Sequence, residues 1–307
     1  MSIIKIFEMF MRDGLQSLSK IYTLQQKNKF IDKLARCNYH AIEFGSSTSA
    51  KLLPQMANGY DIWNHITQSN NHLQTSTKYT LLTPGLTHIE KALDNKINSF
   101  GLVCSVSDKF AHNNLNKTSN DTLINVFTQS TQIINKDPNA HIRIYLSCSF
   151  GSPWEKFDLE YKKRLFEYVE KIIKFGKTNK LSSDNFDIVI SDTVGLSTCE
   201  RTSDILNNLT YNIFQDPNDI KYIGLHLHTN STNNSFKNLI DNSLKYNISK
   251  FDSSLLGIGG CPFAEDNSLG NCSTIKLVEH IEHVHKLNTG INLDILKLIE
   301  EEIKIEL

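Results

Sequence analysis

Two histidines one residue apart, His226 and His228, follow a short apolar run that is typical of a β-strand. Alternate residues of a strand point to the same side, so both imidazoles could reach a single ion. Asp13 and Asn271, in other polar segments, would add a carboxylate and an amide oxygen. Two nitrogens and two oxygens, completed by water, favour octahedral Mg²⁺ or Mn²⁺. Zn²⁺ is the less favoured choice, although two histidines and a carboxylate also form catalytic zinc sites.

The competing interpretation of these residues is purely structural. Partly buried histidines hydrogen-bond to their neighbours, and an Asp before a Gly, as in Asp13-Gly14, is common in turns and caps. The position of Asp13 directly after Arg12, at a predicted strand end, weakens that interpretation. A buried Arg12 would itself need a carboxylate partner, because an unpaired buried charge is costly. Glu43 and Asp192 are the candidates, either as counter-ions or as carriers of a proton.

One of the six cysteines, Cys261, stands in the glycine-rich segment GIGGCP at residues 257–262. The glycines do not form a dinucleotide-binding fingerprint, which argues against a phosphate cradle. A lid that brings one reactive thiol over a site is the better interpretation, and an inert cysteine in a turn is the alternative. The cysteines show no CxxC pair, so we expect a reducing compartment without a disulfide framework.

Short β-branched and aromatic runs alternate with longer amphipathic stretches, a pattern typical of repeated βα units around a parallel sheet. The predicted strands are Ile3–Phe10, Ala41–Phe44, Tyr79–Leu82, Phe100–Ser105, Ile142–Ser147, Phe186–Ile190, Tyr222–His228 and Phe251–Leu256. The predicted helices are Leu24–Ala35, Tyr60–Gln68, Thr87–Leu93, Asn120–Ile134, Leu159–Phe175, Glu200–Asn212, Ser235–Tyr246 and Thr274–His285.

Eight strand–helix pairs in 307 residues predict one α/β domain, residues 1–307, with the fold of a (β/α)₈ TIM barrel. The barrel would take in residues 3–286. A C-terminal extension, 287–307, would hold one more helix, Asn292–Glu301, and a loosely packed tail.

The polar candidates gather at one end of this predicted barrel. Enzymes of this fold build their active sites at the carboxyl ends of the strands. The candidates lie after the first strand (Arg12, Asp13), at the end of the second (Glu43), after the sixth (Asp192), at the end of the seventh (His226, His228) and after the eighth (Cys261, Asn271). Five strand ends therefore predict a single active site.

Composition restricts the class of partner. The net charge is −1, so nothing indicates a nucleic-acid footprint or a basic membrane-binding face. No apolar run approaches the roughly 18 residues that a membrane span needs. No secretory or organellar presequence precedes the first predicted strand, and we expect a cytoplasmic protein.

The chain resembles the 3-hydroxy-3-methylglutaryl-CoA lyase family from about Ile4 to Leu296. The segments that carry the resemblance are Arg12-Asp13-Gly14-Leu15-Gln16, Ile42-Glu43 with Ser46 and Ser49, Lys51 with Pro54-Gln55-Met56, Leu82-Thr83-Pro84, Tyr145-Leu146-Ser147-Cys148, Gly151-x-Pro153, Asp192-Thr193-Val194-Gly195, His226-Leu227-His228, and Gly259-Gly260-Cys261-Pro262-Phe263-Ala264 ahead of Gly270-Asn271. One departure bears on the predicted metal site, because Thr229 stands where the family usually has an acidic residue.

The resemblance implies a retro-Claisen cleavage of 3-hydroxy-3-methylglutaryl-CoA to acetoacetate and acetyl-CoA, and a homodimer. It implies Mg²⁺ or Mn²⁺ on Asp13, His226, His228 and Asn271. Arg12 would stabilise the thioester enolate, and Cys261 would protonate it. Glu43 and Asp192 would be supporting acids, with Asp192 acting through His226. Gln16, Ser46 and Tyr145 would join Arg12 as substrate contacts.

Two other functions compete with the lyase. A related aldol or Claisen catalyst would use the same barrel on another acyl-CoA or a 2-oxo acid, and the thiol of Cys261 argues against it. A barrel that has lost catalysis would serve only as a CoA-binding or metal-binding protein. Such a protein should lack a ligand or Arg12, and neither is missing.

Overall fold

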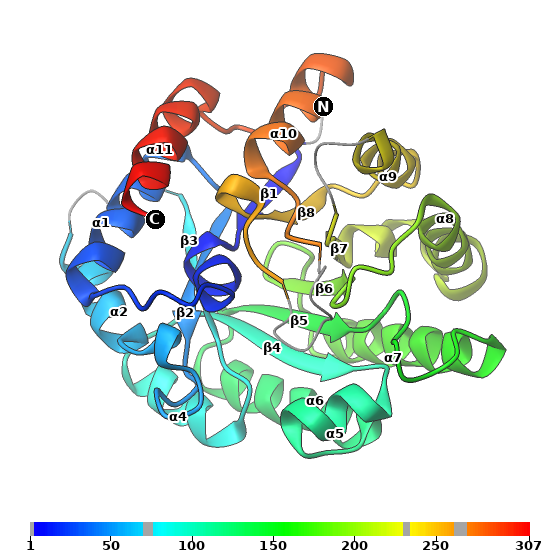
Figure 1. Ribbon diagram of the computed structural model, residues 1–307. Helices are drawn as coiled ribbons and strands as arrows, with labels where there is room; N and C mark the ends of the chain where they lie inside the picture. The colour runs from blue at the N-terminus through cyan, green and yellow to red at the C-terminus, as the bar shows by residue number, and fades with distance from the viewer. Residues whose placement is uncertain (1–2, 70–75, 230–233, 261–268) are drawn as a thin grey trace.

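The computed structural model describes residues 3–69, 76–229, 234–260 and 269–307. Eight parallel strands form a closed barrel in which each strand pairs with the next and the eighth closes against the first (Figure 1). The strands are β1 (Lys5–Glu8), β2 (Ala41–Ser46), β3 (Lys78–Leu82), β4 (Ser99–Ser105), β5 (His141–Ser147), β6 (Phe186–Ser191), β7 (Ile223–His226) and β8 (Lys250–Ser253). The predicted (β/α)₈ barrel is confirmed.

Helices surround the barrel; most connect successive strands, and the last two follow β8 (Figure 1). They are α1 (Leu24–Leu34), α2 (Gly59–Gln68), α4 (Leu86–Asp94), α5 (Asp108–Leu115), α6 (Ser119–Lys136), α7 (Leu159–Thr178), α8 (Cys199–Asn208), α9 (Asn234–Lys245), α10 (Thr274–Glu279) and α11 (Leu293–Glu306). Each predicted helix has a counterpart, and α5 was not predicted. The prediction of a loosely packed tail is wrong, because α11 continues to Glu306 and buries Leu296, Ile299 and Ile303. None of the helices in the described ranges is both long and apolar enough to cross a bilayer.

The alternation of residues along each strand separates two interiors. On β5, Ile142 and Ile144 belong to the hydrophobic core between the barrel and its helices. Their neighbours Arg143 and Tyr145 point the other way, into the barrel, because alternate residues face opposite sides of a strand. The barrel is therefore held from outside by apolar packing, while its interior is free to carry polar groups.

Charged side chains fill the part of the barrel interior nearest the strand starts. Arg143, fully buried, contacts Asp187 through Nη1 at 3.0 Å and Asp252 through Nη2. Asp187 also accepts a hydrogen bond from His141 Nε2 at 2.9 Å and pairs with Lys250. We call these five residues the lumen network. Because every member has an oppositely charged or hydrogen-bonding partner, their burial leaves no isolated charge.

The chain leaves β1 through a π-helical turn, Phe10–Gly14, which places Arg12 and Asp13 at the rim. β1 ends at Glu8, two residues before its predicted end. The buried Glu8 carboxylate explains the change, since its Oε1 accepts hydrogen bonds from Phe10 N and Leu255 N, both at 2.9 Å. Its Oε2 accepts another from Thr274 Oγ1 at 2.7 Å. One side chain thus joins the rim turn to the exit of β8 and the start of α10.

Candidate active site

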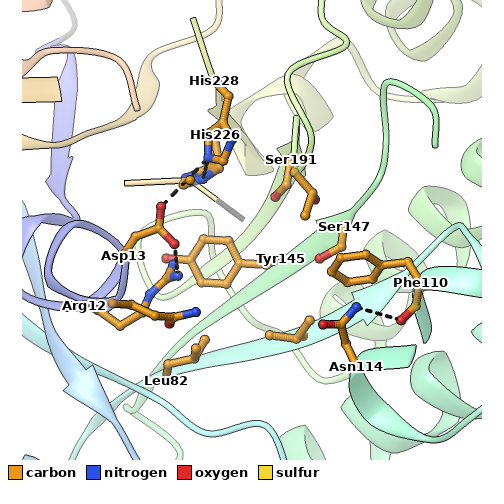
Figure 2. Close-up of a pocket in the computed structure, with 14 residues that line it drawn as sticks. Arg12, Asp13, Leu82, Phe110, Asn114, Tyr145, Ser147, Ser191, His226 and His228 are labelled. Atoms are coloured by element: carbon orange, nitrogen blue, oxygen red, sulfur yellow. Dashed lines mark hydrogen bonds and ion pairs between the residues drawn. The ribbon is translucent and has the colours of Figure 1, made fainter. Parts of the chain in front are cut away.

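A cavity of about 160 Å³ opens at the carboxyl ends of the strands. Six of the residues predicted as metal ligands, catalytic groups or substrate contacts line it: Arg12, Asp13, Gln16, Tyr145, His226 and His228. Figure 2 shows Asp13 between the Arg12 guanidinium and the two imidazoles. Leu82, Val103 and Phe110 supply an apolar side. The arrangement suits a small polar group with an apolar portion.

The two histidines converge with Asp13 in a buried cluster. His226 Nε2 and His228 Nε2 lie 3.1 Å apart, and His228 Nε2 lies 3.8 Å from Asp13 Oδ2. Two atoms about 2.1 Å from one ion, at a right angle, lie about 3.0 Å apart. The spacing and chemistry of these ligand atoms therefore fit a divalent ion. Asn271 lies beside the cluster, and its Nδ2 donates to Asp13 Oδ2 at 2.7 Å.

Asp252 on β8 sets the orientation of His226. Its Oδ2 lies 3.1 Å from His226 Nδ1, so Nδ1 carries the proton and Nε2 faces His228 with its lone pair. The other Asp252 oxygen contacts Arg143 of the lumen network. The sequence did not reveal this residue as functional. A carboxylate at an inward-facing position of the last strand was the only available signal.

The charges of the cluster shift the pKa values of its members. Burial alone would raise the pKa of Asp13, but Arg12, His226 and His228 lower it to about 2. Burial and the neighbouring His226 lower the pKa of His228 to about 3, so its ring is neutral. Burial also acts to lower the pKa of His226, but Asp252 outweighs it, so the pKa of His226 is raised. An ionised carboxylate and a neutral imidazole are the protonation states that metal binding requires.

Arg12 holds its place through two carboxylates. Its Nε donates to Glu43 Oε2 at 2.5 Å, and its Nη1 pairs with Asp13. Burial opposes the charge, yet Glu43 and Asp13 raise the pKa of Arg12 above its usual range, so the cation is permanent. The guanidinium carbon also lies 5.8 Å from the centre of the Tyr145 ring. A fixed positive charge therefore faces the cavity beside the metal-type cluster.

Glu43 retains one oxygen without a hydrogen-bond partner among the described residues, Oε1. Gly101 leaves room for it, since a Cβ at that position would lie 2.7 Å from Oε1. Burial raises the pKa of Glu43, although Arg12 opposes the shift. The sequence expectation that a carboxylate pairs with Arg12 is met by Glu43.

Asp192 lies beside the cluster but directs its side chain elsewhere. Its backbone N donates to the His226 carbonyl at 2.8 Å. Its carboxylate accepts hydrogen bonds from Leu196 N at 2.7 Å and Ser197 N at 3.0 Å. Burial raises its pKa. Between Asp192 and Asp252, it is Asp252 that contacts the His226 ring.

The segment after β8 passes very close to the cluster. Gly259 has φ +132°, and a Cβ on it would lie 1.8 Å from Asn271 Nδ2 and 2.9 Å from Asp13 Oδ2. Glycine is needed here for its backbone conformation and for this close approach. The sequence analysis interpreted these glycines only as part of a lid and did not predict this close approach. Cys261 lies outside the described residues.

The remaining predicted contacts differ in their access to the cavity. Tyr145 lines it and its hydroxyl lies 3.6 Å from Met9 Sδ. Ser46 is buried and its Oγ lies 2.9 Å from Thr48 Oγ1. Thr229, which follows the second histidine, has a buried Oγ1 without a hydrogen-bond partner among the described residues.

The fold and the rim cluster define a (β/α)₈ barrel with a buried two-histidine, one-carboxylate site of the kind that holds a divalent ion. The chain belongs to the HMGL-like family, whose model matches residues 3–303. The resemblance found in the sequence is thus confirmed.

Individual relatives agree with this assignment. The chain is 28% identical to the mitochondrial hydroxymethylglutaryl-CoA lyase of Homo sapiens over 299 residues, which cover 97% of this chain and 83% of that protein. It is 27% identical to hydroxymethylglutaryl-CoA lyase YngG of Bacillus subtilis over 303 residues, covering 97% and 93%. The solved HMG-CoA lyase of Bacillus subtilis superposes with a TM-score of 0.83 at 26% identity, covering 99% and 93%. That of Brucella melitensis gives 0.82 at 24% identity, covering 99% of each chain, and shares the fold.

Proposed function

We propose that this chain is a metal-dependent carbon–carbon lyase that cleaves 3-hydroxy-3-methylglutaryl-CoA to acetoacetate and acetyl-CoA. The observation that carries the proposal is the buried Asp13–His226–His228 cluster beside Arg12 in one rim cavity. Membership of the HMGL-like family and relatives named hydroxymethylglutaryl-CoA lyase supply the substrate class.

Asp13, His226, His228 and Asn271 are the proposed ligands of the ion, with Asn271 acting through its amide oxygen. Mg²⁺ or Mn²⁺ suits this mixed set better than Zn²⁺. A divalent ion at this position would lower the pKa of the substrate hydroxyl and fix its orientation. Asp252 supports the set by holding His226 in the tautomer that presents Nε2.

Arg12 is the proposed partner of the charge that develops when the carbon–carbon bond breaks. The electron pair of that bond passes to the thioester carbonyl and forms an enolate. A pre-positioned cation in a buried cavity stabilises such an oxyanion without reorganisation. Because Arg12 is already held by Glu43 and Asp13, it needs no movement to meet that charge.

Two proton transfers complete the reaction. Asp192, a buried carboxylate whose backbone contacts that of His226, is the proposed acceptor of the hydroxyl proton. To act, it would have to release the hydrogen bonds that it accepts from Leu196 N and Ser197 N. Cys261, outside the described residues, is the proposed donor to the enolate carbon. Glu43 is the supporting acid, and Gln16, Ser46 and Tyr145 are the proposed substrate contacts. Transfers of this kind contribute about 10²–10⁴ in rate.

Purified chain should be stripped of metal and incubated with 3-hydroxy-3-methylglutaryl-CoA, then with Mg²⁺, Mn²⁺ or excess chelator. We expect equal amounts of acetoacetate and acetyl-CoA with either metal and none with chelator. Metal binding without cleavage, together with condensation of acetyl-CoA and a 2-oxo acid, would replace the lyase by its Claisen-type alternative. Metal binding with neither reaction would indicate a barrel that has lost catalysis. A homodimer and a cytoplasmic location stay predictions.

A further inference from the structure

A second group of possible metal ligands lies in the outer helix layer. Asp241 is on α9, His280 begins the π-helical turn His280–Val284 that ends α10, and His285 follows that turn. The two helices are neighbours in the ring around the barrel (Figure 1). A few residues beyond His285, the Asn288 carbonyl accepts a hydrogen bond from Ile4 N at 2.9 Å, where the chain enters β1. The group therefore lies toward the strand starts, away from the rim cavity.

The three side chains converge on one point. His280 Nε2 and His285 Nε2 lie 2.5 and 2.6 Å from the same atom, Asp241 Oδ1. The ring centres are 5.2 Å apart and the ring planes are nearly perpendicular, at 77°. One nitrogen from each ring and one carboxylate oxygen thus form a compact triangle, all within 4.8 Å of one another.

The group is reachable from solvent. The His280 side chain is 6% exposed, whereas those of His285 and Asp241 are 28% and 36% exposed. One ligand is therefore anchored in the structure, and the other two form its open side. An ion has a path to the site, and a water molecule can complete its coordination.

We propose that Asp241, His280 and His285 bind a transition-metal ion of the Zn²⁺ type. Two imidazoles and one carboxylate, with water in the fourth position, form an established ligand set for zinc. Among the described residues, this group lacks the second oxygen ligand that Asn271 offers at the rim, so nitrogen outnumbers oxygen and Zn²⁺ is favoured over Mg²⁺ and Ca²⁺, which prefer oxygen ligands. The ion ties α9 to the end of α10, the helices that follow the segments carrying His228 and Asn271. This proposal is independent of the lyase activity.

Zinc stoichiometry tests it. The full chain, stripped of metal, is dialysed against Zn²⁺ and the bound metal counted. Wild type should bind one more equivalent of Zn²⁺ than the His285→Ala or His285→Gln variant. Lyase turnover with Mn²⁺ should be the same in all three proteins. His283→Ala is the matched control, because His283 lies in the same turn, is exposed and is outside the group. It should keep the full stoichiometry.

A second measurement separates a bound ion from a hydrogen-bonded triad. In an Asp13→Asn background, which disables the rim site, Zn²⁺ should raise the melting temperature, because a ligand of the folded state stabilises it by mass action. Adding His285→Ala should abolish that rise, whereas adding His283→Ala should not. Equal zinc stoichiometry in wild type and the His285 variants would overturn the proposal, as would a melting temperature that Zn²⁺ leaves unchanged in the Asp13→Asn chain.

Discussion

Asp252 Oδ2 lies 3.1 Å from His226 Nδ1, while the other oxygen of Asp252 contacts Arg143. The same carboxylate therefore orients a rim imidazole and closes the lumen network. Removing an outer partner of a metal-bound histidine typically costs 10–100-fold in metal affinity.

We expect Asp252→Asn to weaken Mn²⁺ binding by about that factor in a calorimetric titration. Asp187→Asn is the control, because it removes the other partner of Arg143 without touching His226. It should lower stability but leave Mn²⁺ affinity near that of wild type. Equal Mn²⁺ affinity in the Asp252 variant and wild type would contradict the assigned role.

Gly259→Ala should impair both metal binding and turnover at the rim cavity. The new methyl would overlap Asn271 Nδ2, so Asn271 and Asp13 would have to separate. Turnover and Mn²⁺ affinity should both fall by at least about tenfold, which corresponds to 1.4 kcal/mol. Gly290→Ala is a suitable comparison, since Gly290 also has a positive φ, +74°, but nothing lies within 4 Å of its new Cβ. Backbone strain should lower the melting temperature of the Gly290 variant, while its turnover and Mn²⁺ affinity should equal those of wild type.

Arg12→Gln should nearly abolish turnover, because the enolate would lose its fixed cation. The free energy of unfolding should fall as well, since the buried Glu43 would lose its charged partner. Arg12→Lys is the informative companion. The lysine ammonium keeps the charge but lacks the planar fork that reaches Glu43 and Asp13 at once. The turnover of Arg12→Lys should therefore lie between that of wild type and that of Arg12→Gln. A normal kcat/KM in Arg12→Gln would remove Arg12 from the reaction.

Cys261→Ala should lower kcat by about 10²–10⁴ if the thiol delivers the proton to the enolate carbon. Metal binding should be retained, because none of the proposed ligands changes. Cys272→Ala is the matched control. That thiol is buried, its pKa is raised by burial, and it has no proposed part in the reaction. Wild-type turnover in the Cys261 variant would exclude its role.

Glu8 should give the fold a pH dependence of a definite sign. Burial raises its pKa to about 7 from an ordinary value of 4.5. Between these values the folded chain holds a proton that the unfolded chain releases, so the free energy of unfolding falls as pH rises. The slope is up to about 1.4 kcal/mol per pH unit and ends above pH 7.

Glu8→Gln should flatten that part of the stability profile. Gln is the same size, and its oxygen still accepts from the backbone of Phe10 and Leu255 while its amide faces Thr274. Denaturant melts from pH 4.5 to 8 should therefore show the variant gaining on wild type as pH rises. Parallel profiles would mean that Glu8 titrates normally in the folded chain.

The eight strand–helix units were predictable because alternation and amphipathic periodicity are local properties. Predictions from local sequence patterns failed where a feature depends on contacts with residues distant in the sequence. β1 stops early because Leu255, Thr274 and the turn itself share the Glu8 carboxylate. α5 is short and holds poor helix formers such as Asn113 and Asn114, so its pattern was weak. Yet its Phe110 and Asn114 line the cavity.

The rim residues were predictable as a set, but their pairing was not. The order of strands brings Arg12, Asp13 and the two histidines to one end of the barrel. Which carboxylate meets His226 depends on the register between β7 and β8, where His226 stands opposite Asp252. Asp192, the carboxylate favoured from the sequence, is occupied by backbone amides of its own loop.

The lumen network has a consequence for how this barrel can evolve. In an apolar core, one side chain of similar volume replaces another at small cost. Here each charge is balanced by a specific neighbour, so a single replacement leaves a buried charged partner unpaired and lowers the free energy of unfolding by about 3–5 kcal/mol. Drift at Arg143, Asp187 or Asp252 must therefore cross a low-fitness intermediate or proceed by paired changes. The outer apolar shell is free to vary one position at a time.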